Sequence, residues 1–164
     1  MAMLWDLPVI FVIENNQYAM GTSVGRSTKS PSLWERGAAY GIKGESVDGM
    51  DVLAVKASGE RATALCRKGN GHYILEIITY RYRGHSMSDP ARYRTREEVQ
   101  KIRSERDPIE NIREVILKGE HSTEENLKKI DTQIKDIVND AAEFSKLSPE
   151  PNINELFSDI YISD

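Results

Sequence analysis

The chain has 164 residues, of which 39% are hydrophobic and 29% charged, and its formal net charge of −4 gives no general attraction to nucleic acid. The longest apolar run, over residues 8–13, is too short to span a bilayer, and no signal-peptide pattern precedes it. A single cysteine, Cys66, excludes a disulfide framework and favours a reducing, cytosol-like compartment.

Apolar and turn-forming segments alternate at the start of the chain. Residues 1–5 favour a helix but have no cap before them, so they predict the last turn of a helix in a truncated chain. An apolar strand follows over residues 9–13. The Gly-, Ser- and Thr-rich residues 21–32 predict a loop, and residues 33–40 predict a short helix that Gly41 ends.

A strand, a helix and a second strand come next. Val47 lies in a short strand, which Asp48 and Gly49 close with a turn signal. Asp51 predicts the N-cap of a helix, and residues 73–80 are β-branched, aromatic and apolar, as in a strand covered on both faces. The inward positions of the helix are expected to be Val52, Val55, Ala62 and Leu65. This order predicts an α/β fold with an open, mostly parallel sheet.

The remainder of the chain is predicted to be helical. Residues 95–98 fit a capping box, and residues 107–108 supply a cap and a first-position proline. A third helix begins near Ser122 or Thr123 and ends before Pro149. Its apolar residues at helical spacing are Leu127, Ile130, Ile134, Ile137, Val138, Ala141 and Phe144. We interpret this stripe as core packing or a contact between subunits.

Two polar loops follow the ends of the apolar strands, where parallel sheets bind their ligands. The first loop contains Asn15, Asn16 and Tyr18. An amide oxygen is a hard, neutral ligand for Mg²⁺ or Ca²⁺, and a turn can direct the Tyr18 carbonyl toward the same ion. Alternatively, the two amides only bond the backbone of the turn. The Asn-Asn dipeptide alone leaves both interpretations open.

The second loop is basic although the chain is acidic. Its arginines are Arg81, Arg83, Arg92, Arg94 and Arg96. Guanidinium groups match phosphate oxygens, His85 can donate to a phosphate or transfer a proton near neutral pH, and Gly84 permits close backbone approach. The alternatives are that the arginines pair with acids elsewhere, with His85 a surface residue, or that the alternating Arg and Tyr residues bind single-stranded nucleic acid. The shortness of the patch disfavours nucleic acid.

A resemblance to a known family rests on three blocks of sequence. They are LPVIFVIENNQYAMGTS at residues 7–23, VDGMD at 47–51, and TYRYRGHSMSDP with YRTREE within 79–98. These blocks resemble the alpha subunits of pyruvate dehydrogenase E1 components, which are thiamine diphosphate-dependent 2-oxo acid dehydrogenases. The resemblance covers essentially the whole chain. It implies a partial thiamine diphosphate-binding α/β domain over residues 1–94, and a helical region over 95–164 packed on that domain.

The resemblance also implies roles for individual residues. Asn16 and the backbone carbonyl of Tyr18 would bind Mg²⁺, which bridges the diphosphate of thiamine diphosphate in a cleft between alpha and beta subunits. His85 would contact the diphosphate side of the cofactor, and Arg81 would order the loop that carries His85. The Gly-Asp-Gly motif that precedes Asn-Asn in these enzymes is absent, so the isolated chain is expected to be inactive.

The implied reaction is the oxidative decarboxylation of pyruvate, with transfer of the acetyl group to the lipoyl domain of E2. The implied assembly is a heterotetramer of two alpha and two beta subunits. Related enzymes act on branched-chain 2-oxo acids or acetoin, which stay open as substrates. A different class of function is a noncatalytic module that binds a beta subunit or an acidic partner.

Two serines match regulatory phosphorylation positions of mitochondrial relatives, Ser86 and Ser23. The second phosphorylation site of the loop is missing, because the segment is shorter and Arg92 stands near its place. We therefore expect Ser86 to be a structural loop residue in a bacterial, cytoplasmic chain. The mitochondrial matrix is the alternative if the chain is eukaryotic.

Overall fold

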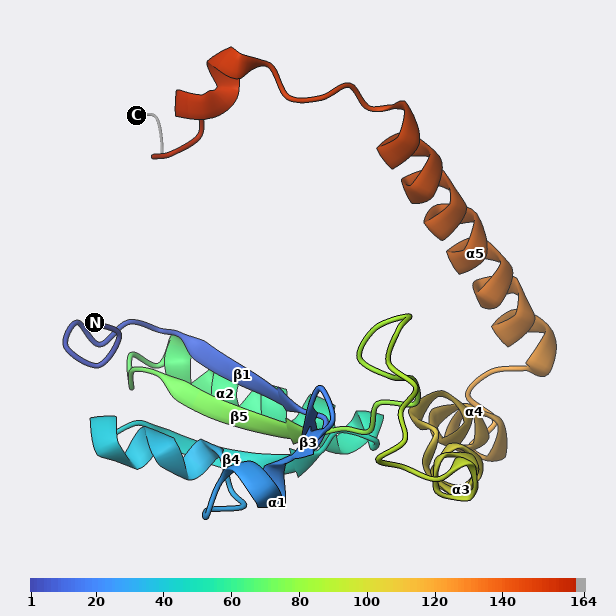
Figure 1. Ribbon diagram of the computed structural model, residues 1–164, viewed down its shortest axis with the longest axis horizontal. Helices are drawn as coiled ribbons and strands as arrows, with labels where there is room; N and C mark the ends of the chain where they lie inside the picture. The colour runs from blue at the N-terminus through green and yellow to red at the C-terminus, as the bar shows by residue number, and fades with distance from the viewer. Residues whose placement is uncertain (162–164) are drawn as a thin grey trace. The chain divides into compact units, whose positions relative to one another are not determined.

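A small parallel sheet forms the core of the first part of the chain in the computed structural model, which describes residues 1–161 (Figure 1). The chain divides into two compact units, Met1–Ile116 and a second that begins at Leu117. The sheet belongs to the first unit, and all its neighbouring strands run parallel. In spatial order the strands are β1 (Ile10–Asn15), β5 (Tyr73–Ile78) and β4 (Lys43–Asp48). The predicted α/β fold with a parallel sheet is confirmed.

The two faces of the sheet are covered by different elements, α2 (Val52–Arg67) and the 3₁₀ helix η1 (Trp34–Tyr40). Glu45 of β4 accepts a hydrogen bond from Ser58 of α2 at 3.0 Å. The preceding residue, Gly44, faces η1, since a Cβ there would lie 3.3 Å from the Trp34 ring. Neighbouring residues of a strand point to opposite faces, so α2 and η1 lie on opposite sides.

Small residues bring α2 close to the sheet. Ser58, Ala62 and Cys66 are the buried residues of this helix, and the carboxylate of Asp51 caps it by accepting from two backbone amides, as predicted. Val52 was expected to face inward, but it is 43% exposed. The expectation was wrong because the apolar spacing alone does not show which part of a helix face touches the sheet. In α2 the contact follows the small side chains, which allow the helix to pack closely.

The loop predicted over residues 21–32 contains regular structure. A short antiparallel hairpin, β2 (Tyr18–Ala19) and β3 (Thr22–Ser23), leads into α1 (Val24–Ser27). The hairpin turn places Met20 at φ 53, a left-handed conformation that glycine normally supplies, so the sequence carried no strong turn signal. Residues 1–5, predicted as the last turn of a helix, form a single turn in which the Trp5 amide donates to the Met1 carbonyl at 3.1 Å.

Three helices follow the sheet, and each begins where its cap was predicted. They are α3 (Arg96–Arg106), α4 (Pro108–Lys118) and α5 (Glu124–Leu147). Thr95 and Thr123 accept hydrogen bonds from amides three residues later, and Asp107 accepts from the amides of Ile109 and Glu110. The ion pair of Arg106 with Asp48, at 2.7 Å, joins the end of α3 to β4.

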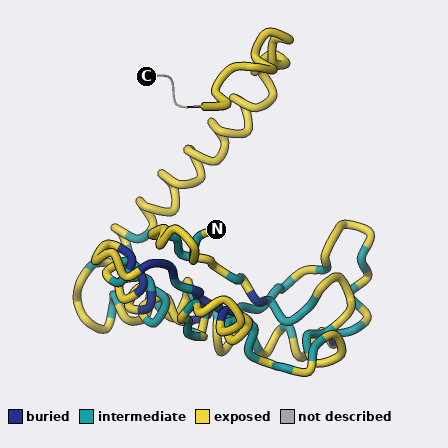
Figure 2. Tube along the Cα trace, turned by 90° about the vertical axis from the view of Figure 1, so that its left-hand side faces the viewer, coloured by how far each residue is buried: buried dark blue, intermediate teal, exposed yellow. Residues whose placement is uncertain are grey.

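Most residues of α5 are exposed (Figure 2), and they include an apolar stripe. Ile130, Ile134 and Ile137 are 52%, 53% and 60% exposed. The stripe therefore has no core within the described residues, and a contact between subunits stays a prediction. A 3₁₀ helix, η2 (Ile153–Phe157), follows. Within residues 1–161, no helix combines the length and the apolar character needed to cross a membrane.

A buried carboxylate connects β1, β5 and η1. Glu76 of β5 has no exposed surface, and its Oε1 accepts from Nδ2 of Asn15 at 2.6 Å. Its Oε2 accepts from the backbone amides of Leu33 and Trp34 at 2.8 and 3.2 Å. The carboxylate thus holds the end of β1 and the start of η1 against the central strand.

Removing this carboxylate should destabilise the protein strongly. Glu76→Ala leaves three donors without their acceptor in the interior, and we expect it to lower the free energy of unfolding by about 3 kcal/mol. Glu76→Gln keeps one acceptor oxygen and should lose less. Urea denaturation of the 164-residue chain measures both. The control is Glu60→Ala, which removes an exposed pair with Lys56 and should change stability by less than about 0.5 kcal/mol; equal losses at both positions would contradict the role of Glu76.

Candidate functional site

The two predicted loops meet at one edge of the sheet. β1 and β5 are parallel neighbours with Asn15 opposite Ile78, so both strands deliver their following residues to the same edge. Nη2 of Arg81 donates to the Met20 carbonyl at 2.8 Å, and the rings of Tyr18 and Tyr93 lie with their centroids 4.9 Å apart. The loops are therefore joined by direct contacts.

The two asparagines of the first loop differ in burial and in their hydrogen bonds. Asn15 is 4% exposed, and both its amide groups are used: Oδ1 accepts from the Gln17 amide at 3.0 Å and Nδ2 donates to Glu76. Asn16 is half-buried, and its Oδ1 accepts from the Tyr18 amide at 3.1 Å. Both side chains stabilise the turn, but an amide oxygen has two acceptor positions. Asn16 therefore retains capacity to bind a ligand.

Residues of the first loop with candidate ligand oxygens line a small pocket. Asn16 and Tyr18 line a pocket of about 270 Å³, together with Glu14. Neutral oxygens of this kind are ligands for Mg²⁺, which also requires ligands from other sources to reach about six. Over residues 1–161, no group of three or more His, Cys, Asp or Glu side chains could hold a metal ion. This chain would therefore supply a minority of the ligands, and phosphate oxygens could supply others.

His85 lies exposed at the other side of the edge. Its Nδ1 is 3.5 Å from Nη1 of Arg81, whose Nη2 also donates to the Tyr93 hydroxyl at 2.9 Å. A guanidinium group only donates, so the tautomer that matches this contact has Nδ1 as the acceptor and the N–H at Nε2. His85 lines a pocket of about 220 Å³ with Ser86 and Asp89. The arrangement can offer one N–H donor to an anion in that pocket.

Asp89 organises this loop, and the sequence analysis did not identify it. Its Oδ2 accepts from the His85 amide at 2.7 Å and from the Tyr93 hydroxyl at 2.8 Å, and its Oδ1 accepts from the Ala91 amide at 2.8 Å. The backbone N–H of His85, then that of Ala91 and the Tyr93 hydroxyl, lower the pKa of Asp89 to about 2. Gly84 fits because a Cβ there would lie 2.7 Å from the Asp89 carbonyl oxygen. The Asp-Pro dipeptide was the available turn signal.

Arg94 is a buried structural residue of the same loop. Its Nη1 donates to the Arg81 carbonyl, and its Nη2 donates to the Arg83 carbonyl at 2.9 Å. Its guanidinium carbon also lies 5.1 to 5.6 Å from the centres of three tyrosine rings, those of Tyr18, Tyr80 and Tyr93. Arg94 is therefore held by backbone carbonyls and aromatic rings, not by acids elsewhere in the chain.

The two candidate regulatory serines have different surroundings. The hydroxyl of Ser86 is exposed and lies 3.0 Å from that of Ser88. Ser23 is half-buried in β3 and makes no side-chain cap bond at the start of α1. Phosphorylation of either serine stays a prediction.

The model of the family described as "Dehydrogenase E1 component" matches residues 1–154. The chain belongs to the dehydrogenase E1 component family. This membership agrees with the resemblance inferred from the loop sequences.

Similar proteins carry consistent names. The chain is 54% identical over 162 residues to the pyruvate dehydrogenase E1 component subunit alpha of Rhizobium meliloti, covering 99% of this chain and 47% of that protein. It is 49% identical over 162 residues to the subunit of the same name from Rickettsia bellii, covering 99% and 49%. It is 51% identical over 165 residues to the mitochondrial subunit of Dictyostelium discoideum, covering 100% and 43%. The E1 chain thus spans about half the length of these relatives.

Acid should disorder the His85 loop only at very low pH. The folded loop favours the ionised form of Asp89. Ionised Asp89 therefore stabilises the loop fully above about pH 4, and this stabilisation is lost as the pH falls toward 2. We expect the amide NMR signals of His85 and Ala91 to titrate with a midpoint near the lowered pKa of about 2. Asp89→Asn should abolish this titration, while the α5 control Asp136→Asn should preserve it. A wild-type midpoint at the ordinary value of 3.8 would contradict the model of the loop.

Proposed function

We propose that the chain is part of the alpha subunit of a pyruvate dehydrogenase E1 component. In this proposal it contributes to the oxidative decarboxylation of pyruvate and to the transfer of the acetyl group to the lipoyl group of E2. The observation that carries the proposal is the contact between the two loops, through the bond from Arg81 to the Met20 carbonyl. This contact supports the proposal because it joins, at one edge of the sheet, the loop whose oxygens would bind the cation and the loop whose N–H group would meet the diphosphate.

The chain would hold one side of thiamine diphosphate and its Mg²⁺. Oδ1 of Asn16 and the carbonyl oxygen of Tyr18 would bind the ion, which would bind the diphosphate. Nε2 of His85 would donate to the diphosphate side, while Arg81 keeps the imidazole ring in place through Nδ1. When bound, thiamine diphosphate supplies the carbon nucleophile and accepts the electron pair left by loss of CO₂. The protein groups position the reactants and stabilise charge.

The names of the relatives favour pyruvate over a branched-chain 2-oxo acid or acetoin. The partners in this proposal are an E1 beta subunit, in a heterotetramer of two alpha and two beta chains, and the lipoyl domain of E2. The exposed apolar stripe of α5 supports a subunit contact, because solvent contact of such a stripe is unfavourable. The enzyme would act in the cytoplasm of a bacterium or in the mitochondrial matrix of a eukaryote.

A Mg²⁺ titration of the assembled enzyme tests the cofactor site. The gene that encodes this chain is expressed with an E1 beta subunit, and pyruvate-dependent reductive acetylation of a lipoyl domain is measured. Asn16→Ala removes a charge-neutral ligand, and we expect the Mg²⁺ concentration for half-maximal activity to rise by about tenfold or more. The control Asn139→Ala alters an exposed amide of α5 and should leave the titration unchanged. An unchanged Mg²⁺ requirement in Asn16→Ala would refute the assignment.

The α5 stripe can be tested separately through assembly. Ile134→Asp places a charge in the middle of the stripe and should weaken association with the beta subunit by about tenfold or more, because burying an unpaired carboxylate is costly. The control Lys135→Asp introduces the same side chain at the next position, outside the stripe. Sedimentation velocity of the two variants with the beta subunit compares them. Equal assembly of wild type and Ile134→Asp would exclude this stripe from the contact.

A further inference from the structure

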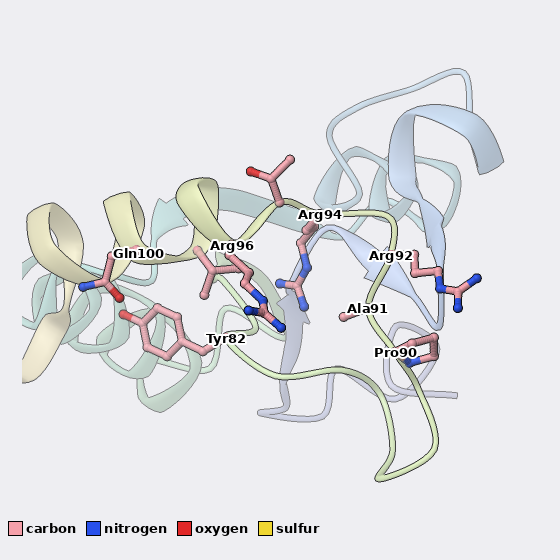
Figure 3. Close-up of a pocket in the computed structure, with 9 residues that line it drawn as sticks. Tyr82, Pro90, Ala91, Arg92, Arg94, Arg96 and Gln100 are labelled. Carbon is pink, nitrogen blue, oxygen red and sulfur yellow. The ribbon is translucent and has the colours of Figure 1, made fainter.

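A third pocket lies where the His85 loop joins α3 (Figure 3). Its volume is about 500 Å³, within the range of small-molecule sites. Its lining includes Tyr82, Pro90, Arg92, Arg94, Arg96 and Gln100. It shares no lining residue with the pocket of about 220 Å³ beside His85, so it is a separate site.

The lining of this pocket is positively charged and contains no carboxylate. Three arginines line it, although the whole chain has a net charge of −4. Arg94 is 8% exposed, and its Nε is buried without a hydrogen-bond partner among residues 1–161. Arg92 and Arg96 form no ion pair with the acids of that same part of the chain. Within the described residues, these three arginines therefore have no ion-pair partner.

The arginine side chains and the helix start are arranged around one space. In Figure 3 the guanidinium groups of Arg94 and Arg96 extend to the same side of the backbone near Tyr82, whereas that of Arg92 points outward. The first residues of α3 also line the pocket. Thr95 accepts from the Glu98 amide, which leaves the amides of the first two helical residues without partners inside the helix. A helix N-terminus of this kind favours an anion.

Three nearby acids, Glu98, Asp107 and Asp89, are directed to other partners. Glu98 accepts from the Tyr80 hydroxyl at 2.8 Å, and Asp107 accepts from the Tyr82 hydroxyl at 3.2 Å. Asp89 accepts from three donors of its own loop. None of these carboxylates lines the pocket. They therefore leave room for an external anion between the arginines.

We propose that this pocket binds the phosphate or carboxylate group of a small ligand, held by Arg94, Arg96 and the N-terminus of α3. Guanidinium groups match both oxyanions, and an anion here offsets the repulsion between two neighbouring cations. Arg94 also fastens the Arg81 and Arg83 carbonyls, so a bound anion stabilises the loop that carries His85. The site requires no thiamine diphosphate and stands independently of the proposed function.

Anion titrations of the full 164-residue chain test the site without any cofactor. Inorganic phosphate and acetate are added in separate series at constant ionic strength, and amide NMR signals are followed. We expect saturable shifts at Thr95, Arg96 and Val99. Tighter binding of phosphate identifies a phosphate site, and tighter binding of acetate identifies a carboxylate site.

Matched variants separate the pocket from general electrostatics. Arg96→Gln removes one guanidinium and should weaken binding by about tenfold or more. Gln100→Glu adds a carboxylate to the lining and should also weaken anion binding. This second variant tests the site even if Arg96→Gln does not fold. Arg67→Gln removes the same charge from an exposed position at the end of α2 and should preserve the affinity. The proposal is overturned if neither anion gives saturable shifts at these amides, or if Arg67→Gln weakens binding as much as Arg96→Gln.

Discussion

The buried carboxylate of Glu76 is the interaction on which the candidate site depends. An unpaired charge in the central strand would be costly, and three donors from Asn15, Leu33 and Trp34 satisfy it. Two of the donors are backbone amides at the start of η1, and the third is the side-chain amide of the last residue of β1. One carboxylate therefore holds β1 at the edge of the sheet, so that Asn16 emerges there in a defined position.

Polar residues at this edge fall into two groups: those that hold the two loops together and those that are free to bind a ligand. Arg81, Asp89 and Arg94 make hydrogen bonds to backbone atoms and to a tyrosine hydroxyl, and Arg81 also contacts the His85 ring. These bonds hold the loops together without a ligand. Asn16 and His85 each contact the protein through one side-chain atom. They keep an oxygen acceptor position and a ring N–H for a ligand. Pre-ordered donors and acceptors of this kind reduce the entropic cost of binding.

Features that depend on neighbouring residues were predicted well. The caps at Asp51, Thr95, Asp107 and Thr123 all accept from amides two or three residues later. The parallel order of strands also followed from segment spacing. The β2–β3 hairpin was missed because Met20 occupies the left-handed turn position. Asp89 was missed because its three partners become neighbours only when the loop closes on itself.

The sequence by itself determined the α/β order, the helix starts and the kinds of side chain that follow β1 and β5, because periodicity and capping act over a few residues. Only the tertiary structure decided which asparagine is structural: Asn15 is buried because it reaches Glu76, far along the chain, whereas Asn16 remains half-buried. It also distinguished arginines that look alike in sequence, since Arg94 is buried against tyrosine rings and Arg96 is exposed at a pocket. Burial and pairing arise from contacts between distant segments, and no local pattern contains them.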